Sequence, residues 1–590
     1  MYVCMCVFVC VCVCMYACMF VCVNFPRMEG PLLPCLVMVV CNGSELLEER
    51  PLSPLCPGGA SVLTIVWCLV DVFGLPVGVA GPSGVNKIHV RIGRTRFFHN
   101  ANEAKLDGDV IDASRFPVSQ VTRVEWCHRL QDPRLRKLIL TRNQVDHVWC
   151  KEILAQLSGH PALESLSLDA TELSYLSLVE FVLPLLRTLP ALQELAIGEN
   201  TFTNDSVHQL CETLSCVSNL RILNMKQIKL SDPSVVHSLC LSLKAVHGLE
   251  ELHLGETALT VESFSRLSPW LSSTQSLRLL DLTRAIGGAF ADICREDFLS
   301  ALFKDLTGNH SLQVLRLAGC VMGPSGAALA ASVLQNLPLV ELNLQDNGLC
   351  TEGCQIICKA LTGHSSLESL DLSDNRLTSS ATDSILQVVS SALQLQVLIL
   401  DENDLGEEFT ARLTPALGGR LEIPAAALLS TLSLSANHLT DAAWLPLAEF
   451  IRDYDAVENL ALAGNGFCDG LVAKEFATAV AGSRILHTLD LAANDFGQQM
   501  QSSLTLAAWR SPVLRTLRMD TSDQPQYLCD MLLLNEEMNL TALWELLEDR
   551  VVEKSSTWFS VLKEVVEVLQ DHLTLQKRHL VPPNLVDVVS

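Results

Sequence analysis

The sequence predicts an α/β solenoid in which short parallel strands line a concave face and helices cover the convex face. One observation is a leucine-rich pattern of eleven residues that recurs fourteen times along the chain. Another is its spacing, because ten of the thirteen steps between successive patterns are 28 or 29 residues long. A fixed period of this length indicates stacked copies of one structural unit, each of which buries its apolar side against the next.

The pattern reads L-x-x-L-x-L-x-x-N-x-L, with substitutions at single positions. Its alternating L-x-L predicts a short strand whose leucines point into the solenoid and whose intervening residues point outward. Stacked repeats would pair these strands in parallel. The fourteen patterns begin at Leu135, Leu163, Leu192, Leu220, Leu249, Leu277, Leu312, Leu339, Leu367, Leu395, Leu429, Val457, Leu486 and Leu514.

The asparagine of the pattern stands where the chain leaves the strand. We expect its amide to pair with backbone groups of the buried turn that would otherwise lack partners. Ile228 and Ala285 cannot pair in this way, so we expect looser turns in repeats four and six. The asparagine is present at Asn143, Asn200, Asn347, Asn375, Asn403, Asn437, Asn465 and Asn494, and weaker partners replace it at Thr171, Thr257, Cys320 and Ser522.

Amphipathic helices are expected between the strands, because a repeat of 28–29 residues has room for a strand, a helix and two turns. In residues 353–366, for example, Ile356, Ile357, Ala360 and Leu361 share one face at helical spacing. The two longest steps place insertions at residues 285–295 and 418–426, and we expect these insertions to lie on loops.

The repeats resemble leucine-rich repeats of the ribonuclease-inhibitor-like class. That class includes ribonuclease inhibitor, the Ran GTPase-activating protein, tropomodulin and the sensing domains of NOD-like receptors. The resemblance rests on motifs such as LVELNLQDNGL from Leu339 and LESLDLSDNRL from Leu367, and it covers residues 130–522. It implies a horseshoe-shaped solenoid but no particular activity. The chain departs from ribonuclease inhibitor in one respect, because asparagine and cysteine types do not alternate between neighbouring repeats.

The repeats divide the chain into four predicted parts. Residues 101–134 form an N-terminal cap, residues 135–522 form the solenoid, and residues 523–590 form a helical C-terminal cap with a flexible tail. Residues 1–100 are a poorly defined, Cys/Val-rich region of low complexity. Within it, residues 1–23 alternate valine and cysteine as a translated dinucleotide repeat would, which favours a mispredicted start. A membrane segment or signal peptide is the alternative.

Composition restricts the partners. The formal net charge of −25 argues against nucleic-acid binding, which requires a basic surface. Twelve of the 23 cysteines are scattered from Cys127 to Cys529 without the spacing of a disulfide scaffold. We therefore expect free thiols and a cytoplasmic location. We also expect a monomer that binds a protein and does not bind membranes.

The candidate partner-binding site consists of side chains that flank the leucines in repeats eight to ten. Strands about 4.8 Å apart would gather their carboxylates in a patch roughly 10 Å across. Such a patch would attract a basic protein surface, although an acidic face that is merely solvated is the alternative. The candidate residues are Glu341, Asn343, Asp346, Asp371, Asp374, Asp401 and Glu402.

Catalytic chemistry is not indicated. No combination of nucleophile, base and orienting residue stands on a credible frame, so we predict no enzyme, no catalytic residues and no cofactor. Cys350, Cys354 and Cys358 recur at i, i+4 and i+8, but a straight helix spreads three such residues too far apart to share one zinc ion. We therefore predict no metal site and assign these cysteines to packing.

The sequence accordingly predicts a protein-binding scaffold or adaptor that presents a concave leucine-rich-repeat surface. One alternative is a GTPase-activating protein that resembles the Ran-directed type. Another is a membrane-tethered or secreted receptor ectodomain, which depends on residues 1–23 being part of the natural protein.

Overall fold

The computed structural model describes residues 109–114, 123–286, 291–421, 423, 428–454, 456–468 and 473–519, with short segments at 6–8, 18–24 and 36–41. The predicted C-terminal cap, Ser522 and most of residues 1–100 lie outside these ranges. The chain divides into two compact units, of which residues 101–507 and 516–524 form the repeat unit. In the other unit, β2 (Cys18–Asn24) pairs antiparallel with β1 (Cys6–Phe8) and β3 (Leu36–Cys41).

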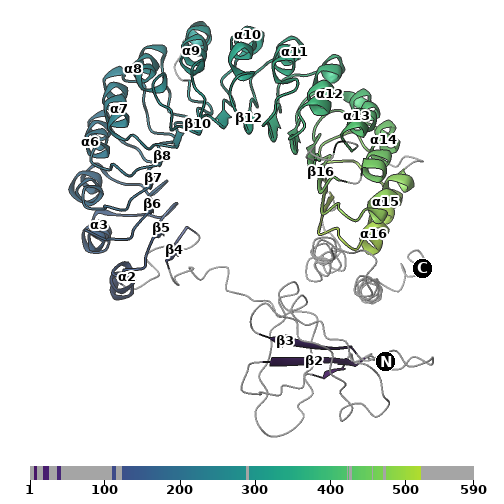
Figure 1. Ribbon diagram of the computed structural model, residues 1–590, viewed down its shortest axis with the longest axis horizontal. Coiled ribbons are helices and arrows are strands. Elements are labelled where there is room, and N and C mark those ends of the chain that lie inside the picture. Colours follow the sequence, from purple (N-terminus) through teal and green to yellow (C-terminus); the bar gives the residue numbers. More distant parts are fainter. Residues whose placement is uncertain are drawn as a thin grey trace. The chain divides into compact units, whose positions relative to one another are not determined.

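The repeat unit contains one parallel sheet of 15 strands in sequential order from β4 to β18. Strands line the inner side of the arc and helices lie along its outer side (Figure 1). The predicted α/β solenoid is therefore confirmed. The strands are β4 (Val110–Asp112), β5 (Lys137–Ile139), β6 (Ser165–Ser167), β7 (Glu194–Ala196), β8 (Ile222–Asn224), β9 (Glu251–His253), β10 (Leu279–Asp281), β11 (Val314–Arg316), β12 (Glu341–Asn343), β13 (Ser369–Asp371), β14 (Val397–Ile399), β15 (Thr431–Ser433), β16 (Asn459–Ala461), β17 (Thr488–Leu491) and β18 (Thr516–Met519). Strands β5 to β18 belong to repeats one to fourteen, and β4 precedes them.

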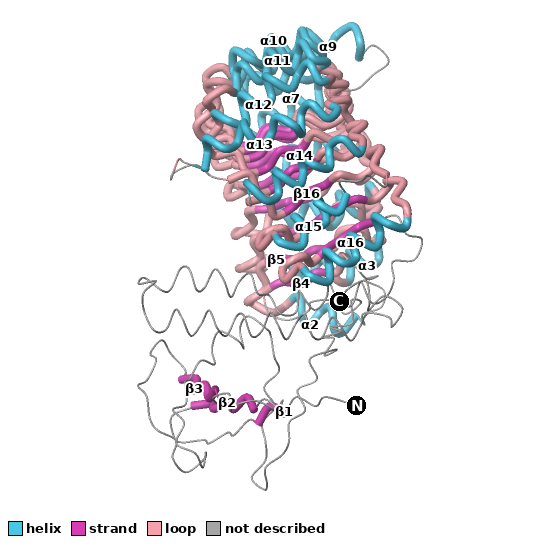
Figure 2. The backbone as a smooth tube through the Cα atoms, turned by 90° about the vertical axis from the view of Figure 1, so that its right-hand side faces the viewer, coloured by secondary structure: helices cyan, strands magenta, loops and turns pink. Residues whose placement is uncertain are grey.

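Helices connect most successive strands on the convex side, as the view turned by 90° also shows (Figure 2). The α-helices are α2 (Arg123–Leu130), α3 (His147–Glu152), α4 (Tyr175–Ser177), α5 (Leu183–Leu186), α6 (Asn204–Leu214), α7 (Pro233–Ala245), α8 (Val261–Leu271), α9 (Ala291–Leu306), α10 (Gly323–Leu334), α11 (Cys350–Leu361), α12 (Thr382–Ser391), α13 (Gly406–Leu421), α14 (Trp444–Glu449), α15 (Ala473–Gly482) and α16 (Gln498–Arg510). Shorter 3-10 and π segments are η2 (Leu154–Leu157), η3 (Leu178–Val182), η4 (Ser379–Ala381), η5 (Asp441–Ala443) and η6 (Phe450–Tyr454).

Two expectations about the helices require correction. Part of each insertion lies in a helix, because α9 and α13 are each 16 residues long, whereas neighbouring α10 has 12. The buried face of α11 also differs from the predicted one. It consists of Gly353, Cys354, Ile357, Cys358 and Leu361, whereas Ile356 and Ala360 are only partly buried. Helix α10 packs closely against this face, since a Cβ at Gly353 would lie 3.2 Å from Cα of Pro324.

The leucines of the pattern form the core. Strand β12 pairs with β13 so that Leu342 lies opposite Leu370, and β13 pairs with β14 so that Leu370 lies opposite Leu398. All three side chains are completely buried. The same register therefore stacks one leucine per repeat along the solenoid and leaves the residues on either side of it on the concave surface.

Buried asparagines connect consecutive repeats. Asn375 donates from Nδ2 to the carbonyl oxygens of Leu344, Leu372 and Ser373 at 2.8, 3.0 and 2.9 Å. Its Oδ1 accepts from the backbone N–H groups of Asn347 and Leu349, both at 3.2 Å. The side chain thus satisfies groups in its own turn, as the sequence predicts, and also groups of the preceding repeat, which the sequence analysis does not include.

The substitutes for asparagine make fewer hydrogen bonds. Thr171 and Thr257 each donate a hydroxyl to a carbonyl in their own turn at 2.7 Å, and Cys320 donates its thiol to Leu282 O at 3.3 Å. Ile228 and Ala285 are completely buried and offer no side-chain partner, but Asn224 and Asp281 accept the N–H groups of Lys226 and Thr283 in these turns, both at 3.0 Å. Looser packing at these two turns stays a prediction.

The residue before each asparagine, or before its replacement, has a left-handed backbone conformation in repeats one to thirteen. This conformation directs the backbone N–H to the next repeat; Asp374 N, for example, donates to Asp401 O at 2.8 Å. The side chain at this left-handed position then points away from the turn at the rim of the concave face. The position accommodates long side chains, since Arg142 and Arg284 occupy it in repeats one and six.

Within the described part of the chain, every helix is too short or too polar to traverse a lipid bilayer.

Candidate functional site: the concave sheet face

The concave surface consists of the side chains that alternate with buried leucines. On β12, Glu341 and Asn343 are partly exposed on either side of completely buried Leu342, and β13 has Ser369 and Asp371 in the same places. Pairing aligns Asn343 with Asp371 and Asp371 with Ile399. Each strand therefore contributes matching positions to rows that cross the sheet.

Long side chains on β5 to β12 connect repeats that are not adjacent. Lys137 Nζ lies 3.1 Å from Glu194 Oε2, with β6 between their strands. Lys226 Nζ reaches Asp281 Oδ2 at 2.7 Å across β9. Each contact joins a repeat to the second repeat along the solenoid, so the charges on this part of the face are partly neutralised by the protein itself.

Glycine leaves space for these connections. A side chain at Gly319 would overlap the side chain of Arg284, which passes over this position to reach Asp346 at 3.3 Å. A Cβ at Gly255 would lie 3.6 Å from Cγ of Lys226. The reach of Arg284 therefore depends on glycine in the intervening repeat, whereas the separation at Gly255 is an ordinary van der Waals contact.

Asp281 is the most deeply buried acid of this network, with a completely buried side chain. Burial alone would raise its pKa. Hydrogen bonds from His253 and Lys226, together with the N–H of Thr283, outweigh burial and hold the pKa well below its usual range. Asp281 is therefore a charged group that the protein itself neutralises.

Asp169 is a contrasting case. Burial raises its pKa, even though Gly198 N and Asn224 Nδ2 donate to its carboxylate at 2.6 and 3.0 Å. We call the concave side chains of β5 to β12, with their connecting pairs, the bridged face.

The seven predicted residues lie on one side of the sheet, but they are not equivalent. Arg316 Nε donates to Glu341 Oε1 at 2.7 Å, and Arg284 Nη2 donates to Asp346 Oδ2 at 3.3 Å. These two acids belong to the bridged face. The acidic patch expected from the sequence is therefore smaller at its N-terminal end than predicted.

Asn343 and Asp371 interact directly, since Asn343 Nδ2 donates to Asp371 Oδ2 at 3.0 Å. The other carboxylate oxygen of Asp371 accepts from Ser373 N and Oγ at 3.0 and 2.7 Å. Burial, with smaller contributions from the carboxylates of Asp401 and Glu341, raises the pKa of Asp371. No basic side chain of the described residues forms an ion pair with Asp371, whereas Lys226 pairs with Asp281.

Asp401 is also held by neutral donors, with Ser435 N at 2.7 Å from Oδ1 and the Ser433 hydroxyl beside it. Asp374 and Glu402 occupy the left-handed rim position in repeats nine and ten. Among the described residues, neither forms an ion pair or side-chain hydrogen bond. Arg376, two residues beyond Asp374, does not pair with them.

Sequence reasoning overlooked the neutral members of this surface. Val397 and Ile399 are partly exposed on β14, beside Asp401 and Glu402. The next two strands carry mainly short concave side chains, such as Thr431 on β15 and Ala461 on β16. At the following strand, Arg518 Nη1 lies 3.2 Å from Asp490 Oδ2, which introduces another ion pair. We call the concave side chains of β13 to β16, together with Asp374, Asp401 and Glu402 in the turns that follow β13 and β14, the open face.

The sequence held a signal for the paired charges. Arg284, Gly319 and Asp346 occupy the same rim position in repeats six, seven and eight. Opposite charges two repeats apart, with glycine between them, are visible when the patterns are aligned by position. The arginines that neutralise Asp346 and Glu341 lie in repeats six and seven, outside the three repeats from which the patch was predicted.

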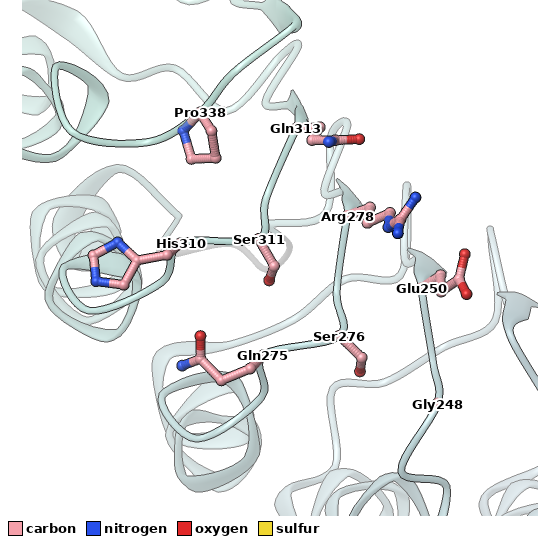
Figure 3. Close-up of a pocket in the computed structure, with 9 residues that line it drawn as sticks. All are labelled: Gly248, Glu250, Gln275, Ser276, Arg278, His310, Ser311, Gln313 and Pro338. Atoms are coloured by element: carbon pink, nitrogen blue, oxygen red, sulfur yellow. The ribbon is translucent and has the colours of Figure 1, made fainter.

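A separate pocket of about 370 Å³ lies where chains return from the helices to β9, β10 and β11. Glu250, Arg278 and Gln313 project at the starts of these strands, whereas His310 lies beside the helix ends (Figure 3). Arg221 Nη1 already contacts Glu250 at 3.0 Å. Most residues that line the pocket are polar, and none of the seven predicted residues is among them.

No group of three or more histidine, cysteine or acidic side chains in the described ranges is arranged to hold a metal ion. Cys354 and Cys358 are buried with their sulfur atoms 3.7 Å apart, whereas Cys350 is exposed. The thiol of Cys354 and burial raise the pKa of Cys358 well above its usual value. The three cysteines do not converge.

Comparison with known proteins agrees with this architecture. Two models described as "Leucine Rich repeat" and "Leucine Rich Repeat" match residues 308–329 and 366–387. Ribonuclease inhibitor from Sus scrofa is 28% identical over 255 residues, which are 41% of this chain and 54% of the inhibitor. The chain therefore contains leucine-rich repeats, and they are similar to those of the ribonuclease-inhibitor-like superfamily.

A second relative matches over a smaller share of its own length. NACHT, LRR and PYD domains-containing protein 3 from Bos taurus is 29% identical over 239 residues, covering 40% of this leucine-rich-repeat protein and 22% of that relative. The chain thus spans about half of ribonuclease inhibitor and about a fifth of the larger relative. Among solved structures, Rad7 with Elc1 from yeast gives a TM-score of 0.39 at 19% identity, covering 59% of this chain and 80% of that chain.

Proposed function

We propose that this leucine-rich-repeat protein is a scaffold or adaptor that binds a protein partner through its concave sheet face. The supporting observation is the continuity of that face, in which one parallel sheet of 15 strands presents successive rows of outward side chains. A surface of this extent suits a macromolecule better than a small metabolite. The described residues supply no group that points to a catalytic step on it.

The proposal is tested by obstructing the concave face without disturbing the core. Ala461 lies on β16 and is partly exposed, so a tryptophan there would project toward a docked partner. Ala411 is exposed on the convex helix α13 and offers a matched control. Ala461→Trp and Ala411→Trp introduce the same bulk on opposite sides of the solenoid.

The full-length protein and both variants would be used as bait, with co-purifying proteins quantified by mass spectrometry. We expect a partner that Ala411→Trp retains and Ala461→Trp loses, while circular dichroism shows the same fold for all three baits. A partner captured equally by both variants would place binding elsewhere and reject the proposal.

A further inference from the structure

We propose that the open face of β13 to β16 is the docking surface, and that its occupant is an extended or loop segment of a protein partner bearing arginine or lysine side chains. This inference rests on the proposed function and restricts it to one part of the concave face and one partner chemistry. It also revises the predicted patch, since the footprint extends toward β16 and excludes Glu341 and Asp346.

The bridged face is poorly suited to a charged partner. Lys226 and Asp281 lie 2.7 Å apart, and Arg316 Nε lies 2.7 Å from Glu341. A partner that used these groups would have to displace contacts that the protein already makes. The ion pairs of the bridged face therefore stabilise the protein without a partner, and a partner that docked on β5 to β12 would have to break them.

The open face has the opposite character. Asp371 and Asp401 accept hydrogen bonds from neutral donors only, and Asp374 and Glu402 form no ion pair with any residue that the structure describes. Burial raises the pKa of Asp371, with the carboxylate of Asp401 adding to the effect. The complement of such a surface is a cationic one.

The neutral residues decide what kind of cationic partner fits. Val397 and Ile399 lie between the acids of β13 and the short side chains of β15 and β16. Arginine and lysine have aliphatic stems that pack on apolar side chains while their charged ends stay at polar groups. Val397 and Ile399 provide the apolar contact, and the acids beside them provide the polar one.

The small residues determine how closely the segment approaches. Thr431 on β15 and Ala461 on β16 leave room for a partner backbone near the sheet. Four strands at about 4.8 Å spacing span roughly 15 Å, the length of about four or five extended residues. The ion pair of Asp490 with Arg518 limits this surface on one side, and that of Glu341 with Arg316 limits it on the other.

The test uses a fluorescein-labelled decapeptide of alternating arginine and serine, with alternating glutamate and serine as the opposite-charge control. Fluorescence anisotropy measures binding to the full-length protein. The key variant is Asp374→Arg/Glu402→Arg. Arginine fits the left-handed rim position, since Arg142 and Arg284 occupy it in other repeats, so the variant is expected to fold.

The chain provides a matched control. Glu199 and Glu256 occupy the same rim position in repeats three and five, and both are exposed. Glu199→Arg/Glu256→Arg therefore makes the same change of charge in the same backbone conformation, but beside the bridged face. Any effect of total protein charge on the peptide is equal in the two double variants.

We expect the open-face variant to weaken peptide binding on the order of tenfold at low salt, and the control variant by less than about twofold. The difference should disappear near 1 M salt, where the screening length falls to about 3 Å. Equal losses in the two variants, or no loss in the open-face variant, would overturn the inference.

The result separates this inference from the proposed function. A natural partner that is lost with Ala461→Trp but binds Asp374→Arg/Glu402→Arg normally would reject the cationic segment and leave the concave scaffold intact. Analytical ultracentrifugation tests whether a second copy of the chain occupies the open face instead. Self-association that the open-face variant abolishes would identify a second copy of the chain, and would equally overturn the inference.

Discussion

Replacing Asn375 by leucine tests the contact that joins neighbouring repeats. The side chain is completely buried and makes five hydrogen bonds, three as donor and two as acceptor. Leucine fills a similar volume, so the change removes polar contacts more than packing. The N–H groups of Asn347 and Leu349 would lose their partner, at about 1–3 kcal/mol for each buried group. Relaxation of the turn recovers part of this cost, and we expect the free energy of unfolding to fall by about 3 kcal/mol.

A smaller loss is expected at Thr257→Val, because Thr257 fills the equivalent place in repeat five with one hydrogen bond, to Leu254 O at 2.7 Å. We expect a decrease of about 1 kcal/mol. Urea unfolding followed by circular dichroism gives both values, provided that the dependence on urea concentration is the same for each variant. The reasoning would be refuted if Asn375→Leu destabilised the protein no more than Thr257→Val.

Three further predictions concern backbone space, a buried charge and a buried thiol. Gly198→Ala should destabilise the protein by about 1–3 kcal/mol in urea unfolding, because the new Cβ would lie 2.7 Å from Lys226 O. The control Gly248→Ala, which has no neighbouring atom within 4 Å, should change stability by less than about 1 kcal/mol. Equal effects of the two substitutions would contradict this explanation. Lys226→Met should lower stability at pH 7 by about 2–3 kcal/mol. Because the folded-state pKa of Asp281 is lowered, its carboxylate stabilises the fold above its unfolded pKa of about 4, and this stabilisation is lost as the pH falls below that value. The variant should therefore lose less stability than the unmodified protein between about pH 4 and pH 2. An unchanged dependence of stability on pH in this range would argue against the ion pair. Burial raises the pKa of Cys211 to about 12, so iodoacetamide at pH 8 should leave it unmodified until urea unfolds the chain, as peptide mass spectrometry would reveal.

The strands and their register were predictable because the information is local and repeated. Leu342, Leu370 and Leu398 occupy the same position of the repeated pattern, so one period places all three in one row. The role of Asn375 followed from the same periodicity. Helix ends and buried faces were less predictable, since α11 begins at Cys350 rather than near Gly353 and buries Cys354 and Cys358 in place of Ile356 and Ala360.

The arrangement of charges was only partly predictable. Alternation with buried leucines places Glu341, Asn343 and Asp371 on the concave side, whereas Asp346, Asp374 and Glu402 lie at the rim because their backbone is left-handed. The neutralisation of Asp346 depends on Arg284, 62 residues earlier in the chain, and on Gly319 between them. Such contacts depend on side-chain length and on the residue of the intervening repeat. A pattern that describes one repeat at a time does not contain them.

The separation between core and surface explains how the open face can hold unneutralised acids. Leucines and buried asparagines stabilise the stack, so Asp374 and Glu402 need no role in folding. Two like charges about 6 Å apart repel by only about 0.7 kcal/mol in water, but by about 3 kcal/mol at an effective dielectric of about 20. The repulsion between the acids is thus small while they are exposed to water and larger once a partner covers them. A partner that covered these acids without supplying cations would increase the repulsion between them. A basic segment would instead form attractive ion pairs with them. The open face therefore discriminates between partners by charge when the partner covers the acids.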